Sequence, residues 1–205
     1  MIQEGSFMSK SSSPIFYNEL ERSLQSCNSS PPIEEFSKEH SEKLMNLIHE
    51  NMKEFDHGEK TLSTTYRRIK NLETQYSKKG HILFFIRETL SGEPIACAGV
   101  GSFQNLPITE KIGEIRDLVV VERYRNQGLG RKLLYSCLRE AQKLGYKRLY
   151  IETSRQMTVA RTLFTQAGFE AVEELPKKNE LSENMPYYYL FQDLQLKKFS
   201  LEKKC

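Results

Sequence analysis

The sequence predicts a mixed α/β fold, α+β-like in its element order, with one mostly antiparallel sheet of about six or seven strands and about four helices. Two observations lead to this fold class. Short runs of apolar and β-branched residues are separated by amphipathic stretches whose apolar residues recur at helical spacing. Strand-type runs follow one another directly in mid-chain and alternate with helical stretches afterwards, which indicates an antiparallel meander and then a strand, helix, strand crossover.

The chain is expected to form one domain with two tails. Its 205 residues, of which 38% are hydrophobic, are enough for one core, and a second full domain is not expected. Residues 1–31 are rich in Ser, Asn and Pro, which predicts a flexible N-terminal extension. The folded domain is expected over residues 32–195, followed by a short basic tail at residues 196–205.

Two helices are expected before the first strand. Ser37 is a residue type that caps helices, and apolar side chains follow it at helical spacing as far as Phe55. A second amphipathic stretch runs from Leu62 to Tyr76 and ends at Gly80. Two further helices, each followed by a glycine, are expected at residues 129–144 and 156–167. Strands are expected at residues 81–88, 95–103, 112–121, 147–152, 169–174 and 187–194.

Composition argues against several classes of protein. The net charge is only +3 and basic residues are interspersed with acidic ones, which argues against nucleic-acid binding. The four cysteines lie far apart, so neither a zinc site nor a disulfide framework is indicated, and no metal is expected. No apolar run approaches the roughly 18 residues of a membrane span. We therefore expect a cytoplasmic protein without a membrane anchor.

The segment RNQGLG, Arg125 to Gly130, has the features of an anion site. It follows a strand of β-branched residues and opens an amphipathic helix. The first turn of a helix presents unpaired N–H groups and the positive end of the dipole, so backbone amides can hold a pyrophosphate. Gly128 and Gly130 lack the Cβ that would keep phosphate oxygens away, and Arg125 and Arg131 are expected to add charge at the rim. Alternatively, the two glycines only make a tight turn.

The segment EIRDLVVVERYRNQGLGRKLL resembles motif A of the GNAT superfamily of N-acetyltransferases. That signature is Arg or Gln, two residues, Gly, one residue, then Gly or Ala, and Arg125, Gly128 and Gly130 fill its positions. The segment ARTLFTQAGFE is similar to a later motif of the family, with matches at Ala160, Phe164, Gly168 and Phe169. The resemblance covers roughly residues 32–195.

The resemblance implies a single GNAT-type domain whose sheet splays at the cofactor site, and acetyl-CoA as co-substrate without a metal. Residues 118–120 would pair their backbone with the pantetheine amides, and residues 126–131 would hold the pyrophosphate. The expected cofactor-binding residues are Leu118, Val119, Val120, Arg125, Asn126, Gln127, Gly128, Leu129, Gly130, Arg131 and Phe164.

Glu114 is the candidate general base. A lysine-like amine, with a pKa of about 10.4, is almost wholly protonated at pH 7 and needs a proton acceptor before it can attack a thioester. Glu114 lies eleven residues before Arg125, where several family members place a general-base glutamate. It would act through water, since an ordinary carboxylate is far too acidic to keep that proton. The alternative is a glutamate that positions substrate or pairs with Arg116.

The sequence departs from the family where a tyrosine often protonates the departing thiolate. Phe164 stands there and has no proton to give, so the role is lost or passes to another group, with Tyr188 as the candidate acid. The family's helix-start asparagine is replaced by Met157. His57 and Glu59, between the first two helices, are candidates for contact with the acceptor.

Two functions follow from these residues. The first is an N-acetyltransferase that moves an acetyl group from acetyl-CoA to a primary amine of a small molecule or protein by direct attack, as a monomer or homodimer. The second is an acyl-CoA-binding regulatory or interaction module with little turnover, which Phe164 favours. The acceptor amine stays open at this point.

Overall fold

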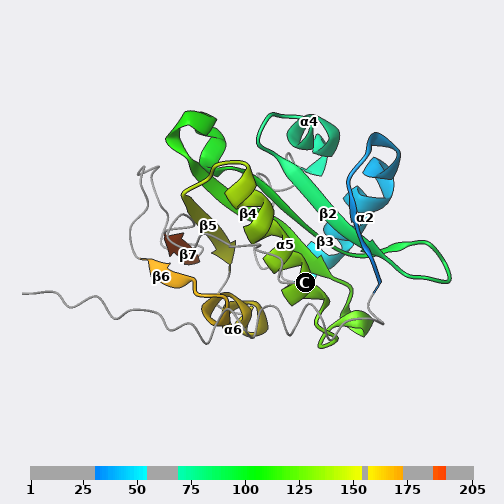
Figure 1. Ribbon diagram of the computed structural model, residues 1–205. Coiled ribbons are helices and arrows are strands. Elements are labelled where there is room, and N and C mark those ends of the chain that lie inside the picture. Colours follow the sequence, from blue (N-terminus) through cyan, green and yellow to red (C-terminus); the bar gives the residue numbers. More distant parts are fainter. Residues whose placement is uncertain (1–30, 55–68, 154–156, 173–186, 193–205) are drawn as a thin grey trace, which may run out of the picture. The chain divides into compact units, whose positions relative to one another are not determined.

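A computed structural model describes residues 31–54, 69–153 and 157–172, together with the backbone of residues 187–192. Within this part of the chain seven strands form one sheet in the order β1-β2-β3-β4-β5-β7-β6 (Figure 1). The strands are β1 (Ile33–Glu35), β2 (Ile82–Arg87), β3 (Pro94–Ser102), β4 (Ile112–Val120), β5 (Arg148–Thr153), β6 (Glu170–Val172) and β7 (Tyr187–Gln192). The helices are α2 (Ser41–Lys53), α4 (Leu72–Tyr76), α5 (Leu129–Lys143) and α6 (Thr158–Gln166).

The predicted fold class is confirmed. Every neighbouring pair of strands is antiparallel except β4 and β5, which run parallel because α5 crosses between them. Short 3-10 turns join several of these elements: η1 (Lys38–His40), η2 (Phe103–Asn105), η3 (Ile108–Glu110) and η4 (Glu122–Tyr124). Among the described residues, no helix combines the length and the hydropathy that crossing a bilayer requires.

The expectation that two helices precede the first strand is wrong. The strand β1 comes before α2 and pairs with β2 at the edge of the sheet, in the register Ile33↔Ile86. Its sequence, IEE, is too short to show an alternating pattern. The strand is stabilised by its pairing with β2 rather than by the β-propensity of its own residues. Of the second expected helix, the described part is α4, which is five residues long.

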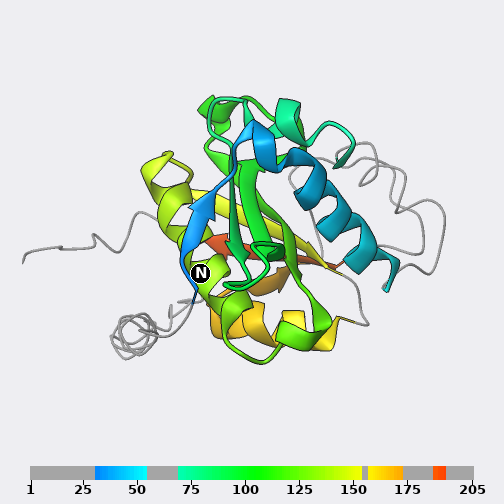
Figure 2. The ribbon, with the colours of Figure 1, turned by 90° about the vertical axis from the view of Figure 1, so that its right-hand side faces the viewer.

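Helices cover both faces of the sheet (Figures 1 and 2). The larger core lies under α5 and α6, where Leu133, Leu134 and Phe164 meet strand residues such as Ile115 and Ile151. The smaller core lies under α2 and α4 on the other face, and its buried residues are Leu44, Leu47, Ile48, Ile69, Leu72, Tyr76, Leu83, Phe85 and Cys97. Alternation along each strand separates the side chains into these two sets.

The strand β4 parts from β5 halfway along its length. The two strands pair only from Ile112↔Arg148 to Ile115↔Ile151, although β4 continues to Val120. On its other side β4 stays paired with β3 as far as Ala96↔Val120, with a register shift between Cys97 and Gly99. The shift is a β-bulge at Asp117, whose φ of 55° lies in the left-handed region. Bulges increase the local twist of a strand, and this one lies two residues past the last β4–β5 pair, Ile115↔Ile151.

Candidate active site

The loop between β4 and α5 ends in backbone amides that point out of a helix start. After η4 the chain passes through Asn126 at φ 62° and Gly128 at φ 80°, and α5 begins at Leu129. The first backbone bond of this helix joins the N–H of Lys132 to the carbonyl of Gly128 at 2.9 Å. The amides before Lys132 therefore have no acceptor within the helix, as at every helix N-terminus, and can bind an anion.

Gly128 provides the space that such an anion needs. A Cβ built at this position meets no protein atom within 4 Å, so the side of the loop where a side chain would stand is open. At Gly130 a Cβ would lie 3.6 Å from Leu163 and Val120, an ordinary packing distance. The positive φ at Gly128 and the open space beside it fit a phosphate-binding turn, whereas Gly130 would accommodate alanine.

Arg125 holds the loop in place, and its charge is already compensated. Its Nε donates to the carbonyl of Val120 at 3.0 Å, and its two terminal nitrogens donate to both oxygens of Glu54 at 2.7 and 2.5 Å. Glu54 raises the pKa of Arg125, and Arg125 lowers the pKa of Glu54. The charge of Arg125 is therefore paired with Glu54, and this pair links the end of α2 to the loop. Arg131 is exposed and donates to Gln166 at 2.8 Å.

Residues Leu118 to Val120 form the open edge of β4. Their side chains divide between the two cores, with Leu118 and Val120 packed toward α5 and Val119 toward α2. Their pairing with β5 has ended, since the last pair is Ile115↔Ile151. One row of backbone donors and acceptors in this segment therefore faces the gap between the strands and is available to an extended ligand. Asn126 and Gln127 are exposed nearby, and Gln127 donates to the carbonyl of Arg123.

Glu114 is buried in the middle of β4, with 8% of its surface exposed. Its neighbours across the sheet are Gly101 on β3 and Tyr150 on β5. Because the adjacent Ile115 packs toward α5, Glu114 points to the opposite face, where α2 and α4 lie. Arg116 lies two residues further along the same strand.

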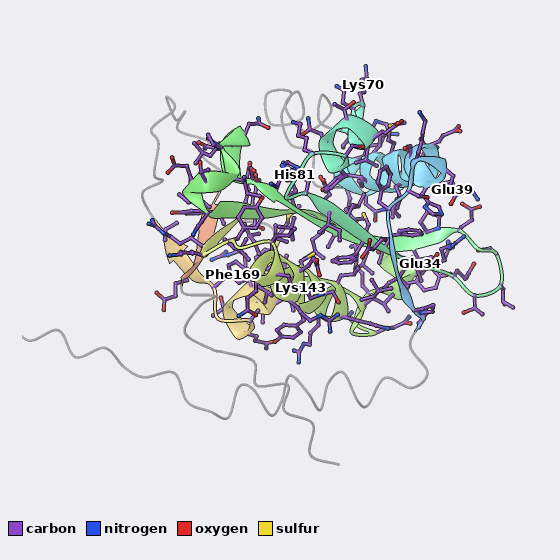
Figure 3. The ribbon with its side chains drawn as sticks, turned by 45° about the horizontal axis from the view of Figure 1, so that its top comes forward. Glu34, Glu39, Lys70, His81, Lys143 and Phe169 are labelled. Carbon is purple, nitrogen blue, oxygen red and sulfur yellow. The ribbon has the colours of Figure 1, made fainter. Side chains whose placement is uncertain are left out.

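A polar cluster that sequence analysis missed lies on the same face as Glu114. The Tyr76 hydroxyl donates to Asp117 Oδ2 at 2.5 Å, and the Arg116 guanidinium lies 5.5 Å from the centre of the Tyr76 ring. Arg116 Nη2 lies 2.7 Å from Nδ1 of His81, which stands just before β2 (Figure 3). Arginine has only donors, so Nδ1 faces a donor, and Nε2 does too, because the backbone N–H of Ser102 points to it at 3.2 Å. Burial, followed by the charge of Arg116, lowers the pKa of His81 to about 4.

Glycines on β3 make room for this cluster. A Cβ at Gly99 would overlap the Tyr76 hydroxyl, and one at Gly101 would overlap the Arg116 guanidinium. The sequence IACAGVGSF contains both glycines, but nothing local to it shows which distant side chains they accommodate. Only the register of β3 against β4, Gly99↔Arg116 and Gly101↔Glu114, brings them together.

The remaining candidates lie elsewhere or outside the described residues. Phe164 is 3% exposed and packs in the core under α6, with its ring centre 6.2 Å from that of Phe169. Tyr188 belongs to β7, where it pairs with Glu152, and its side chain lies outside the description. His57 and Glu59 lie outside the described residues. Among the described residues, no group of three or more His, Cys, Asp or Glu side chains could hold a metal.

Comparisons with known proteins agree with this geometry. The family model "Acetyltransferase (GNAT) family" matches residues 42–169, more than half of the chain. An uncharacterised N-acetyltransferase of Escherichia coli strain K12, YjgM, is 28% identical over 101 residues, which are 48% of this chain and 56% of that protein. The chain thus spans about half the length of the curated relatives it matches.

Solved structures show the same fold. An acetyltransferase of the GNAT family from Staphylococcus aureus Mu50 has a TM-score of 0.62 at 18% identity, over 80% of this chain and 99% of that one. The protein yncA of Salmonella typhimurium, solved with its cofactor acetyl-CoA, has a TM-score of 0.60 at 18% identity, over 86% of this chain and all of that one (100%). The splayed sheet, the glycine turn before α5 and the family match lead to one conclusion: this chain belongs to the GNAT family of acetyltransferases.

Proposed function

We propose that this protein transfers an acetyl group from acetyl-CoA to a primary amine by direct attack of the amine on the thioester. The observation that carries the proposal is the pairing of two backbone features, the open edge of β4 at Leu118–Val120 and the free helix start after Gly128. An extended chain with amides and a pyrophosphate at its far end is complementary to both. Acetyl-CoA has these parts and supplies an activated acyl group.

The residues proposed to hold acetyl-CoA act mostly through their backbone. Leu118 to Val120 would pair with the pantetheine amides, and Asn126 to Arg131 would bind the pyrophosphate through the amides of the loop and the first turn of α5. The open side of Gly128 supports this assignment. Arg125 would act indirectly, because its bonds to Val120 and Glu54 fix the loop that carries the amides.

Glu114 is proposed to remove the proton that the amine must lose. It lies on the face of the sheet opposite to α5, so a base there would meet an acceptor that approaches from the α2 and α4 side. Transfer through a water molecule suits a carboxylate that is held by the sheet. The proton acceptor and the backbone site for acetyl-CoA would then lie on one strand, β4.

The second candidate function is an acyl-CoA-binding module with little turnover, and Phe164 is the observation that favours it. Its ring is buried in the core and supplies no proton. A thiol with a pKa near 8.5 leaves tolerably as the thiolate, so the lack of an acid need not stop catalysis. We expect Phe164→Tyr to change turnover by less than about threefold, because thiolate departure is not the difficult step. A gain of about tenfold or more in steady-state rate would instead favour the module.

One experiment separates the two functions. Calorimetry measures whether acetyl-CoA binds, and a thiol assay measures release of coenzyme A with a panel of primary amines that includes amino acids, polyamines and peptides. The proposed function predicts both binding and amine-dependent release. Binding without release on the whole panel would favour the module, and the lack of binding would contradict both.

A further inference from the structure

We propose that the acceptor is a small amine that also carries a carboxylate, of the amino-acid class, and that Arg116 binds this carboxylate. The inference rests on the proposed acetyltransferase function and names the chemical class of its acceptor. It starts from the charge of one buried side chain on the face where Glu114 lies.

Arg116 is a buried cation that has no anionic partner in the described part of the chain. It is 8% exposed, and among the described residues no carboxylate lies within ion-pair distance of it. Its Nε is fully buried and has no hydrogen-bond partner within the described part of the chain. A guanidinium has five N–H donors, and burying its charge is costly unless an anion compensates for it. Buried polar groups in native proteins are almost always hydrogen-bonded, so an unpaired donor on a buried cation points to a functional role.

The two neighbours of the guanidinium do not neutralise it. Both ring nitrogens of His81 face donors, Arg116 at Nδ1 and the Ser102 N–H at Nε2, so the ring is neutral and brings no negative charge. The Tyr76 ring, 5.5 Å away, attracts a cation through its face but accepts no conventional hydrogen bond. Both contacts orient the guanidinium and leave it positively charged. The Tyr76 hydroxyl itself is directed to Asp117, so that carboxylate is engaged by the tyrosine.

The backbone makes room for the guanidinium. A Cβ at Gly101 would overlap it and would also lie 2.8 Å from His81 Nδ1, so the strand must have glycine at this position for Arg116 to lie against the sheet. A planar guanidinium held in one orientation matches the two oxygens of a carboxylate better than a flexible ammonium does.

The spacing on β4 selects the kind of anion. Glu114 and Arg116 are alternate residues on one face, so their Cα atoms are about 7 Å apart. An amine near Glu114 can therefore place an anionic group at Arg116 only if few bonds separate the two. An α- or β-amino acid meets this condition, whereas a polyamine has no anion to offer and would place a second cation there.

The test compares acceptors with and without this negative charge. The twenty common L-amino acids and β-alanine are assayed beside their carboxamides, with acetyl-CoA as donor. For the best amino acid we expect kcat/KM at least about tenfold above that of its amide. In Arg116→Gln we expect kcat/KM for the acid to fall about 10- to 100-fold, chiefly through KM, and that for the amide to change less than about threefold.

Two further variants serve as controls. Arg116→Lys keeps the charge without the planar fork, so its KM for the acid should lie between those of the parent and Arg116→Gln. Arg87→Gln removes an arginine that pairs with Glu34 on the outer strands and should leave the ratio of acid to amide unchanged. Circular dichroism reports whether each variant folds. The ratio of kcat/KM for acid to that for amide in the parent protein tests the inference even if a variant fails to fold.

The possible outcomes distinguish a failure of this inference from a failure of the proposed acetyltransferase function. If carboxamides or polyamines are acetylated as well as amino acids, the inference is overturned and the acetyltransferase function stands. An equal loss on acid and amide in Arg116→Gln would show that Arg116 only shapes the site. If no amine is acetylated at all, the proposed function fails, and the inference fails with it.

Discussion

Glu114 offers the sharpest test at the scale of single residues. Glu114→Gln keeps the shape of the side chain but removes the proton acceptor, so kcat should fall by about 10²- to 10⁴-fold while acetyl-CoA affinity stays near that of the parent. The pH dependence of the rate should flatten as well. Steady-state kinetics measures kcat, and calorimetry on the same preparation measures the affinity for acetyl-CoA.

The matched control for Glu114 is Glu110→Gln, which removes an exposed carboxylate from η3 and should leave turnover unchanged. If Glu114→Gln keeps full turnover at pH 7, the base lies elsewhere or solvent suffices.

His81 makes stability depend on pH. Its folded pKa of about 4 lies below the ordinary 6.5, so the unfolded chain binds more protons between these values. The free energy of unfolding therefore falls as pH drops through this window. We expect a loss of about 1 kcal/mol between pH 7 and pH 5, less than the full shift implies because the ring is only half-buried.

Urea titrations at both pH values check this, with His81→Asn as comparison. Asparagine keeps an acceptor for Arg116 and does not titrate, so the variant should lose less stability than the parent over the same interval. Equal losses in the two proteins would exclude His81 as the source.

Single residues also show how far sequence reasoning reached. Glu114 could be selected from its distance to the glycine turn, a separation within one continuous segment. For Arg116, two residues later, the sequence offers only a pairing with Glu114. Its proposed role depends on Gly101, Tyr76 and His81, which reach it through strand register and a neighbouring helix. No local sequence pattern predicts contacts between residues that lie so far apart in the chain.

At the scale of elements, α5 provides a matched pair of glycines for a binding test. Gly128 precedes the helix at φ 80° and Gly145 follows it at φ 86°, and a Cβ at either would meet nothing within 4 Å. Alanine at either position should cost about 1 kcal/mol of stability, because both adopt the left-handed conformation. Only Gly128→Ala should also weaken acetyl-CoA binding, by about tenfold or more, since its methyl group faces the proposed pyrophosphate.

Calorimetry with acetyl-CoA measures the affinities, and urea unfolding measures the stabilities. Gly145→Ala controls for backbone strain. An equal affinity of both variants for acetyl-CoA would place the pyrophosphate somewhere other than the start of α5.

Elements that carry their own signal were predicted well, and those that depend on partners were not. The helix α5 has an apolar stripe, a glycine at each end and a length of 15 residues. The strand β1 has three residues and exists because β2 offers an edge. The bulge in β4 uses Asp117 rather than glycine, so nothing in the sequence signals its left-handed conformation. The opening itself was expected from the family resemblance.

At the scale of the whole molecule, the proposed ligand should stabilise the fold. Acetyl-CoA would bind the native edge of β4 and not the unfolded chain, so at 100 times its dissociation constant it should add about 2.7 kcal/mol. For a chain of this size the melting temperature should rise by roughly 5 to 10 °C. Thermal melts at several ligand concentrations check this. A melting temperature that stays constant would contradict binding to the native state.

The parting of β4 from β5 also bears on how long each copy of the protein survives. Within the described residues, the two parts of the sheet are joined by the four pairs from Ile112↔Arg148 to Ile115↔Ile151, so this seam is the place where local opening should begin. A protease cuts chains that open, and a ligand lying along the seam would keep them closed. The half-life in limited proteolysis should therefore lengthen with acetyl-CoA, and less so in Gly128→Ala. Degradation of the protein would then follow the supply of its own substrate.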